Sequence, residues 1–375
     1  MVKRPMRVCY FAVGSDTLRN GYHQKVFRTI DTWRDLGCET LWVLGSRAGA
    51  PADLDFKNGI RPAGEAQLWT WPSGLRRFFW ERAACRRVKE WKPDVIYIRS
   101  AYYTPAVIPL LDTIPCCIEI NTNEDVERQQ LGKLHYLYFR LSSGYVLNRV
   151  KGIVSVTREI AGLPRYVNSR KPIKVIANGI ALTNCTPARN SLAKEPVLVM
   201  MATGNYGWHG LDKLATLARR FPGWKIHLLG DAEVPAEVRS CENILVHGLM
   251  KRSEYEPLLA EAHAGLGSLA LHRKKMEEAC PLKVREYLRY GLPVIGGYID
   301  TDIPDGSDYF LNIGNHELNV KESLDRIEGF VKQWMHRRVE PAAIAHLDYN
   351  FKEQERLDFL SEIAGLKTQR SAVCA

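Results

Sequence analysis

The sequence lacks the cysteine and histidine spacings that hold metals or build disulfide frameworks. Its nine cysteines are scattered, and only Cys116 and Cys117 are close neighbours, so no Cys-x-x-Cys clip is present. The ten histidines contain no His-x3-His pair, which leaves zinc chemistry unsupported. No secretory signal precedes the first expected strand, which begins at Met6. We therefore expect reduced thiols and a cytoplasmic protein.

Long apolar runs and the common catalytic motifs are missing as well. The longest weakly charged stretch, residues 101–120, is interrupted by Asp112 and by prolines, which argues against a lipid-exposed spanning helix. The sequence contains no Walker motif and no Gly-x-Ser-x-Gly. It also has no internal repeat with a period of about 20–50 residues. An integral membrane protein, a P-loop enzyme and a solenoid are therefore not indicated.

The chain is long enough for two domains and carries an excess of positive charge. Of its 375 residues, 46% are hydrophobic and 25% are charged, as in an ordinary globular protein. The 52 Lys and Arg against 42 Asp and Glu give a net charge of +10, which favours anionic partners. Nucleotide sugars and phospholipid surfaces fit this charge. Nucleic acid is not expected, because no nucleic-acid-binding signature accompanies it.

Strand-like apolar runs alternate with helix-length amphipathic segments along the chain. This alternation predicts an α/β fold in which parallel sheets are covered by helices. A polar stretch at residues 183–195, a linker or a surface loop, separates two such units, and residues 350–366 have helical spacing. The expected strands are residues 6–13, 38–44, 94–98, 116–120, 152–156, 174–177, 196–201, 225–229, 243–247, 264–269 and 293–297.

Two glutamates eight positions apart, Glu278 and Glu286, mark the most informative segment. Residues 282–290 have helical composition and end before Gly291, where a C-cap glycine is expected. Glu286 is therefore expected on a helix, and Glu278 on the loop before it. Backbone N–H groups at the start of this helix, around residues 281–283, suit a pyrophosphate. One carboxylate would then hold a ribose and the other a sugar.

The Glu-x7-Glu spacing, followed by Gly-x-Pro-Val-Ile, resembles the nucleotide-sugar site of the retaining family-4 glycosyltransferases, which have the GT-B fold. Other segments follow this family's order and spacing: Asn178-Gly179 within residues 174–180, then residues 228–231, 247–248 and 260–271. The resemblance extends over residues 6–360 and is strong in the second half and weak in the first.

The resemblance implies two Rossmann-like domains facing across a cleft. We expect an acceptor-binding domain at residues 1–178, a nucleotide-sugar-binding domain at 179–349, a C-terminal helix at 350–366 that returns to the first domain, and a tail at 367–375. The implied reaction transfers a sugar, with retention, from a UDP- or GDP-sugar to a hydroxyl of a glycan or lipid-linked glycan. No metal or other cofactor is expected, and bacterial capsule, O-antigen or exopolysaccharide synthesis is the implied setting.

The roles of the donor-site residues come from the same resemblance. Glu286 is expected to accept hydrogen bonds from the ribose hydroxyls, or else to be a solvated carboxylate that pairs with Arg285 or Arg289. Glu278 is expected to contact the donor sugar near the reacting carbon, with Glu277 as its competitor. Lys283 would either donate to phosphate or lie in an exposed first helical turn. The remaining expected donor-binding residues are Gly21, Gly204, Asn205, Pro281 and Leu282.

The chain departs from the family pattern in the loop after the second domain's first strand. Family members generally place there an Arg and, five residues later, a Lys that neutralise the leaving diphosphate, and here Gly204 and His209 occupy these places. Stabilisation would then come from His209, as a catalytic residue, from Lys283, or from helix N-termini. The alternative is a catalytically silent partner of the same fold. An epimerase or a phosphorylase would need residue sets that we cannot place in this sequence.

In the first domain, polar residues follow the expected strands. Residues 14–23 form a loop whose glycines would let the backbone approach a phosphate or the acceptor, or a plain strand-to-helix turn. Open α/β sheets bind ligands at the carboxyl ends of their strands. The candidates for contact with the acceptor are therefore His23, Arg99, Glu119, Asn121 and Glu124, and none has a motif specific enough to name a general base.

Two further motifs have alternative interpretations. Asp300-Thr301-Asp302 matches the Asp-x-Asp metal signature of another glycosyltransferase fold, but in this context we interpret it as a loop turn. Residues 75–92 predict a basic amphipathic helix with seven Lys and Arg and two Glu. This helix either lies on an anionic bilayer at the inner face of the cytoplasmic membrane, or is a domain helix with its charges toward water.

Overall fold

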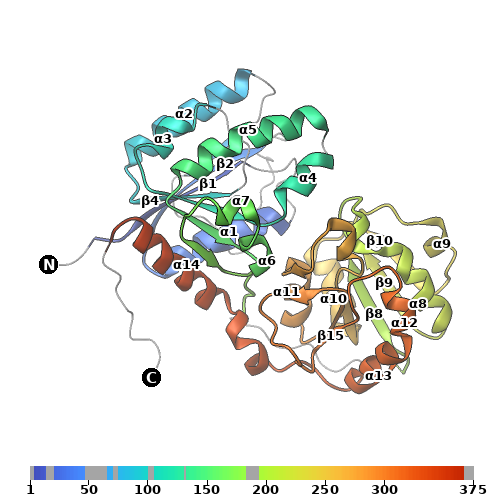
Figure 1. The fold of residues 1–375 in the computed structure, drawn as a ribbon. Coiled ribbons are helices and arrows are strands. Elements are labelled where there is room, and N and C mark those ends of the chain that lie inside the picture. The colour runs from blue at the N-terminus through green and yellow to red at the C-terminus, as the bar shows by residue number, and fades with distance from the viewer. Residues whose placement is uncertain are drawn as a thin grey trace. The chain divides into compact units, whose positions relative to one another are not determined.

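The computed structural model describes residues 4–13, 21–46, 66–70, 75–99, 105–130, 132–182 and 194–366. The chain divides into two compact units (Figure 1), the first formed by Met1–Ile176 together with Tyr349–Ala375, and the second by Ala177–Asp348. The sequence analysis placed this first boundary at residue 178. Of the expected linker, only residues 194 and 195 are among the described residues.

The first unit is built on a seven-stranded parallel sheet in the order β3-β2-β1-β4-β5-β6-β7. The strand β3 was not among the predicted strands. The strands are β1 (Arg7–Val13), β2 (Glu39–Ser46), β3 (Ala66–Thr70), β4 (Val95–Arg99), β5 (Cys116–Ile120), β6 (Gly152–Ser155) and β7 (Ile173–Val175).

Helices on this sheet come from both ends of the chain. The last helix packs beside the first (Figure 1), and Leu357, Phe359 and Leu360 join Tyr10 and Trp33 in one hydrophobic core. The predicted return of the C-terminal helix to the first domain is thereby confirmed. The helices of this unit are α1 (Gly21–Asp35), α2 (Leu75–Trp91), α3 (Ile108–Leu111), α4 (Glu124–Gln130), α5 (Lys133–Arg149), α6 (Arg158–Ala161), α7 (Pro164–Val167) and α14 (Tyr349–Ile363).

A buried cluster of charges fixes α1 and α14 to the sheet. The Nζ of Lys25 lies 2.5 Å from the Oε1 of Glu119, and Arg356 lies 3.9 Å from the same oxygen. Arg356 also pairs with Glu353 and donates to the hydroxyl of Tyr97 over 2.9 Å. All five side chains are almost fully buried. Charges removed from water are stable only when they are paired in this way, so each partner depends on the others.

The second unit has a six-stranded parallel sheet in the order β10-β9-β8-β11-β13-β15. A two-stranded parallel pair, β12 with β14, lies beside the chain that enters α11. The predicted α/β class with two parallel-sheet units is confirmed. The strands are β8 (Val197–Met201), β9 (Lys225–Leu229), β10 (Ile244–Gly248), β11 (Ala264–Leu266), β12 (Glu278–Ala279), β13 (Val294–Gly296), β14 (Ile299–Asp300) and β15 (Phe310–Asn312).

The helix predicted over residues 282–290 is α11 (Leu282–Arg289), and the glycine expected after it has the left-handed conformation of a helix end. Gly291 has φ of +71°, which residues with a side chain rarely adopt. The other helices of this unit are α8 (Leu214–Arg220), α9 (Ala236–Arg239), α10 (Arg252–Glu261), α12 (Asn319–Glu322) and α13 (Leu324–Trp334), with 3₁₀ turns η1 (Gly207–His209), η2 (Leu211–Lys213), η3 (Leu271–Lys274) and η4 (Pro341–Leu347).

The substitution Glu119→Gln should strongly destabilise the protein. It leaves Lys25, Arg99 and Arg356 buried with one carboxylate fewer, and breaking such a buried pair costs about 3–5 kcal/mol. Denaturant unfolding should show this loss. The control is Asp112→Asn, which breaks the exposed Asp112–Arg149 pair and should cost no more than about 1 kcal/mol. Equal losses in the two variants would contradict the role given to the cluster.

Candidate functional site

The strand order of the second unit places a ligand site at one point of the sheet. The chain runs from β8 outward through β9 to β10, then returns to β11 on the other side of β8. Ligands of open α/β sheets bind outside the carboxyl ends of the strands at such a switch point. The loops that follow β8 and β11 are bonded to each other there, since Leu269 donates its N–H to the carbonyl of His209 over 3.1 Å.

The loop after β8 is held in a fixed shape. Gly204 has φ of +72°, and its N–H donates to Asp231 over 2.9 Å. Asn205 accepts from the backbone N–H of Glu233 over 2.6 Å, which ties the loop to the chain after β9. A Cβ at position 204 would lie 2.7 Å from the ring of Tyr206. Glycine is therefore favoured at this position, where the family generally has an arginine.

His209 is neutral in this setting. Its Nε2 lies 3.1 Å from the carbonyl oxygen of Thr203, which can only accept, so Nε2 carries the proton. Its Nδ1 is buried and has no hydrogen-bond partner among the described residues. Burial, with the charges of Lys283 and Lys274 adding to it, lowers the pKa of His209 to about 4. The histidine therefore presents an acceptor atom, and only the approach of an anion would favour its charged form.

Lys274 is a basic residue near His209 that the sequence analysis did not identify. Its Nζ lies 4.4 Å from the ring centroid of Trp208, which is itself stacked on Tyr206 at 4.2 Å. A cation over an aromatic face is attracted by the negative potential of the ring. This lysine lies between the segments at residues 260–271 and 278–286 but belongs to neither, so only the three-dimensional structure shows that it is near Trp208.

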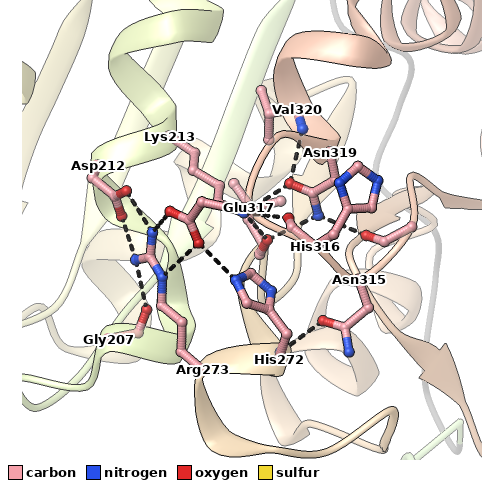
Figure 2. Close-up of polar contacts among 12 residues, drawn as sticks. Gly207, Asp212, Lys213, His272, Arg273, Asn315, His316, Glu317, Asn319 and Val320 are labelled. Atoms are coloured by element: carbon pink, nitrogen blue, oxygen red, sulfur yellow. Dashed lines mark hydrogen bonds and ion pairs between the residues drawn. The ribbon is translucent and has the colours of Figure 1, made fainter.

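A network of charged and polar side chains fixes the segments that carry His209 and Lys274 (Figure 2). Arg273 donates to both carboxylate oxygens of Asp212 over 2.8 Å and also pairs with Glu317, which receives a 2.7 Å contact from His272. The buried Nζ of Lys213 donates to the carbonyls of Leu269 and His316 and to Asn319. These bonds join η1, η2, η3 and the loop before α12 into one frame.

The start of α11 is anchored by the segment around Asn178. The side chain of Asn178 donates to the carbonyl of Cys280 over 2.6 Å, and Arg285 donates to the carbonyl of Asn178 over 2.8 Å. Pro281 precedes the first turn, and no side chain caps it. The first backbone N–H groups of the helix, at Leu282 and Lys283, therefore lie at an end without a side-chain acceptor, which suits an anion.

Lys283 links this helix to the end of β8. Its Nζ donates to the carbonyl of Met201 over 3.0 Å, so the side chain does not lie in an exposed turn. Burial lowers the pKa of Lys283 to about 7. A diphosphate placed beside the amino group would stabilise its charged form and raise that pKa again. The lysine is thus positioned to respond to an anion at the carboxyl end of β8.

Glu286 is held by α10 and not by its neighbours on α11. The hydroxyl of Tyr255 donates to its Oε1 over 3.2 Å, and Arg252 lies 3.8 Å from the same atom. Arg285, one of its expected partners, is instead buried and forms a two-point pair with Asp300. Tyr255 and Arg252 were not identified from the sequence, because they belong to α10 and lie outside the segments that carried the resemblance.

Glu278 is half-buried and lies in β12, which pairs with β14 and sets the direction of the chain before α11. Its neighbour Glu277 accepts from the side chain of Asn315 over 2.9 Å, so the two adjacent carboxylates have different surroundings. Asp300, at the end of β14, uses both carboxylate oxygens for Arg285. The Asp-x-Asp segment is thus a strand end followed by a turn, and its first carboxylate is occupied by a guanidinium.

The candidates in the first unit are largely internal. Glu119 and Arg99 are buried in the charge cluster, where three cations hold the pKa of Glu119 well below its usual range despite burial. Glu124, also buried, accepts from the hydroxyl of Tyr166 over 3.0 Å. These three side chains are engaged inside the unit, and only Asn121 remains half-buried. Its Oδ1 lies 3.4 Å from the Nζ of Lys25.

The expected loop at residues 14–23 ends earlier than predicted. Gly21 and His23 lie in α1, which the structure describes from Gly21 onward. Residues 14–20 and the side chain of His23 lie outside the described part of the chain. The proposed contacts of this loop therefore stay predictions.

The described residues contain no group of three or more His, Cys, Asp or Glu side chains placed to hold a metal ion. Of the helices within the described ranges, none has the length and apolar character needed to cross a membrane.

A family model described as Glycosyltransferase Family 4 matches residues 20–184. This match falls mainly in the first unit, whereas most motifs that carried the resemblance lie in the second. No curated protein matches the chain.

Solved structures match nearly the whole chain. The catalytic domain of starch synthase IV from Arabidopsis thaliana, bound to ADP and acarbose, is 15% identical, with a TM-score of 0.68 over 96% of this chain and 100% of that one. Anabaena HepE in complex with UDP and glucose is 14% identical, with a TM-score of 0.67 over 95% and 100%. A glycosyltransferase from Rickettsia africae is 13% identical, with a TM-score of 0.67 over 95% and 98%. The solved structures show that the chain has the two-domain GT-B fold of these enzymes, and residues 20–184 match the Glycosyltransferase Family 4 model.

Proposed function

We propose that the protein transfers a sugar from a nucleotide diphosphate sugar to a hydroxyl of a glycan or lipid-linked glycan, with retention and without a metal. The observation that carries this proposal is the placement of Lys283 and His209 at the switch point of the second sheet, beside a helix start without a side-chain cap. The two glutamates of the Glu-x7-Glu motif flank this helix start in sequence. An anionic leaving group fits this arrangement.

In this proposal each residue of the second unit has one task. Glu286, held by Tyr255 and Arg252, accepts hydrogen bonds from the ribose hydroxyls. Lys283, the N–H groups at the start of α11 and the Gly204 turn surround the diphosphate. Glu278 contacts hydroxyls of the donor sugar close to the reacting carbon.

Catalysis then rests on stabilising the charge that develops on the departing diphosphate. As the glycosidic bond to the diphosphate breaks, negative charge grows on its bridging oxygen, and fixed cations lower the energy of that state. Lys274 and Lys283 supply the positive charge that an Arg and a Lys supply in the family, at the positions that Gly204 and His209 occupy here. The Nδ1 of His209 has no hydrogen-bond partner among the described residues, so it can accept a proton or a hydrogen bond from the bound donor. The rigid frame around Arg273 keeps these groups in place before the donor binds.

Comparison with solved structures supports a nucleotide donor. Anabaena HepE was solved with UDP and glucose and with UDP-glucose, and the starch synthase IV domain with ADP. We propose that this chain also uses a nucleotide diphosphate sugar, and UDP-sugars and GDP-sugars are the first donors to test. We further propose that the protein acts in bacterial polysaccharide synthesis, at the cytoplasmic face of a membrane.

The direct test is release of nucleoside diphosphate from a panel of UDP-, GDP- and ADP-sugars with EDTA present. Release from one donor, lost in Glu286→Ala, would support a metal-independent transferase and name its donor. Nucleotide binding without turnover, with acceptor glycans present, would favour the silent partner instead. That second candidate rests on Gly204 and His209 in the places of the usual Arg and Lys.

The substitution Glu286→Ala should weaken nucleoside diphosphate binding. Hydrogen bonds to a charged acceptor contribute about 1.5–3 kcal/mol, so the affinity should fall roughly 10- to 100-fold. Isothermal titration with UDP, GDP and ADP measures this. The control is Glu261→Ala, an exposed carboxylate of α10, which should bind like the natural protein. An unchanged affinity in Glu286→Ala would remove the ribose assignment.

Glu278→Ala should reduce turnover more than nucleotide affinity. A contact made to the donor sugar near the reacting carbon stabilises the transition state, and its loss should lower kcat about 100-fold. Steady-state kinetics with the identified donor and titration with its nucleoside diphosphate separate the two effects. The adjacent Glu277→Ala, whose carboxylate is bonded to Asn315, serves as the matched control. A larger effect in the control would assign the role to Glu277.

Nucleoside diphosphate affinity should fall as the pH rises from 6.5 to 9. Because the pKa of Lys283 is lowered to about 7, its amino group is charged below this pH and mostly neutral above it. Binding the diphosphate above the free pKa must therefore take up a proton, which weakens binding by up to about tenfold per pH unit. Titration across this range measures the slope.

The variant Lys283→Met should bind nucleotide more weakly at low pH and show a flatter profile. A terminal phosphate loses its last proton near pH 6, so the ligand itself should not produce the fall above pH 7. Lys225→Met, which removes an exposed lysine at the start of β9, should keep the natural profile. A slope that persists in Lys283→Met would locate the titrating group elsewhere.

A further inference from the structure

The helix α5 exposes a continuous apolar stripe in the first unit. Its five large side chains are between 44% and 82% exposed, and their spacing of three, one, three and four residues places them on one helical face. They are Leu134, Leu137, Tyr138, Leu141 and Tyr145. The core of the unit takes up other positions of the same helix, including Phe139, Val146 and Leu147. Single exposed leucines are ordinary on protein surfaces, but an aligned row of this length marks an interaction surface.

The charges of α5 border this stripe and are all positive. The helix contains no Asp or Glu, and its cations are Lys133, Arg140 and Arg149. At 100° per residue, Lys133 and Arg140 fall on one edge of the stripe and Arg149 on the other. Arg140 lies 3.6 Å from Asp125, and Arg149 lies 2.9 Å from Asp112. Exposed pairs of this kind contribute little, so both guanidinium groups can exchange their partner for a phosphate.

The basic helix for which the sequence left open either a bilayer contact or a place in the domain has a different surface. In α2 the side chains of Glu81, Ala84, Cys85 and Val88 are buried on one face, so the fold uses that face. Among its described large apolar side chains, Phe79 is the exposed one, at 63%. The described part of α2 therefore fits a domain helix with its charges toward water, and α5 has the apolar surface that α2 was expected to supply.

We propose that the apolar stripe of α5 lies in the interface of an anionic phospholipid bilayer, with its leucines among the acyl chains and Lys133, Arg140 and Arg149 at the headgroups. Tyrosines and long basic side chains are the residues that settle at this depth, with apolar parts inward and polar ends toward phosphate. The absence of acidic residues from α5 and the net charge of +10 fit a negative surface. This proposal does not depend on the proposed sugar transfer.

A second copy of the chain fits the stripe less well than a bilayer. A stable protein interface buries about 800 Å² on each partner, and one row of five side chains on a single helix offers less than that. Like charges on α5 would also face each other across a symmetric pairing of this helix. A lipid surface meets the stripe with opposite charge and needs no matching shape.

Cosedimentation of the full chain with lipid vesicles tests the proposal. The natural protein should bind vesicles of phosphatidylcholine with about 30% phosphatidylglycerol, and should bind vesicles of pure phosphatidylcholine far less. The triple variant Leu134→Ser, Leu137→Ser, Leu141→Ser should lower the partition coefficient about tenfold or more. A variant with Lys133→Gln and Arg140→Gln should lose binding mainly to the anionic vesicles.

The matched control is Arg86→Gln with Lys89→Gln, which removes two exposed cations of α2 and should leave most of the binding intact. Thermal unfolding of each variant checks the fold, which should be preserved because the changed side chains are exposed. Equal vesicle binding by the triple variant, or a larger loss in the α2 control, would overturn the proposal. A natural dimer that the triple variant converts to monomer, without vesicle binding, would assign the stripe to a contact between copies.

Discussion

The carboxylate of Glu119, buried at the end of a central strand, is the charge on which the first unit depends. Lys25 from α1 and Arg356 from α14 both reach it, and Arg356 carries Glu353 with it into the interior. A single unpaired charge at this depth would cost more than most apolar contacts supply, so the helices must dock together. The same arrangement accounts for the burial of Glu119 and Arg99 at the carboxyl ends of β5 and β4.

The second unit distributes its charges differently. Three cations form hydrogen bonds or ion pairs that fix the loops: Arg285, Lys213 and Arg273. Lys274 contacts an aromatic ring, and Lys283 donates to a backbone carbonyl. Neither of these two contacts brings in an acidic side chain. In the loop after β8, the left-handed backbone angle of Gly204 favours glycine at that position.

Features set by neighbouring residues were predictable from the sequence, whereas those set by distant ones were not. The helix over residues 282–290 and the left-handed Gly291 follow from local propensity, and the structure has both. The partners of Glu119 lie in the first and last helices, so its burial could not be seen from the motif around it. Likewise, the spacing of leucines and tyrosines in α5 shows that one face is apolar. It does not show whether that face meets the core.

The return of α14 to the first unit also orders the assembly of the protein during synthesis. The core of the first unit needs Leu357, Phe359 and Leu360, which the ribosome adds only after the whole second unit has been made. Domains usually fold as units in the order of their synthesis, beginning at the N-terminus. Here the second unit has its complete sequence before the first does, so the nascent first sheet must wait with its α14 side uncovered until the chain is nearly finished.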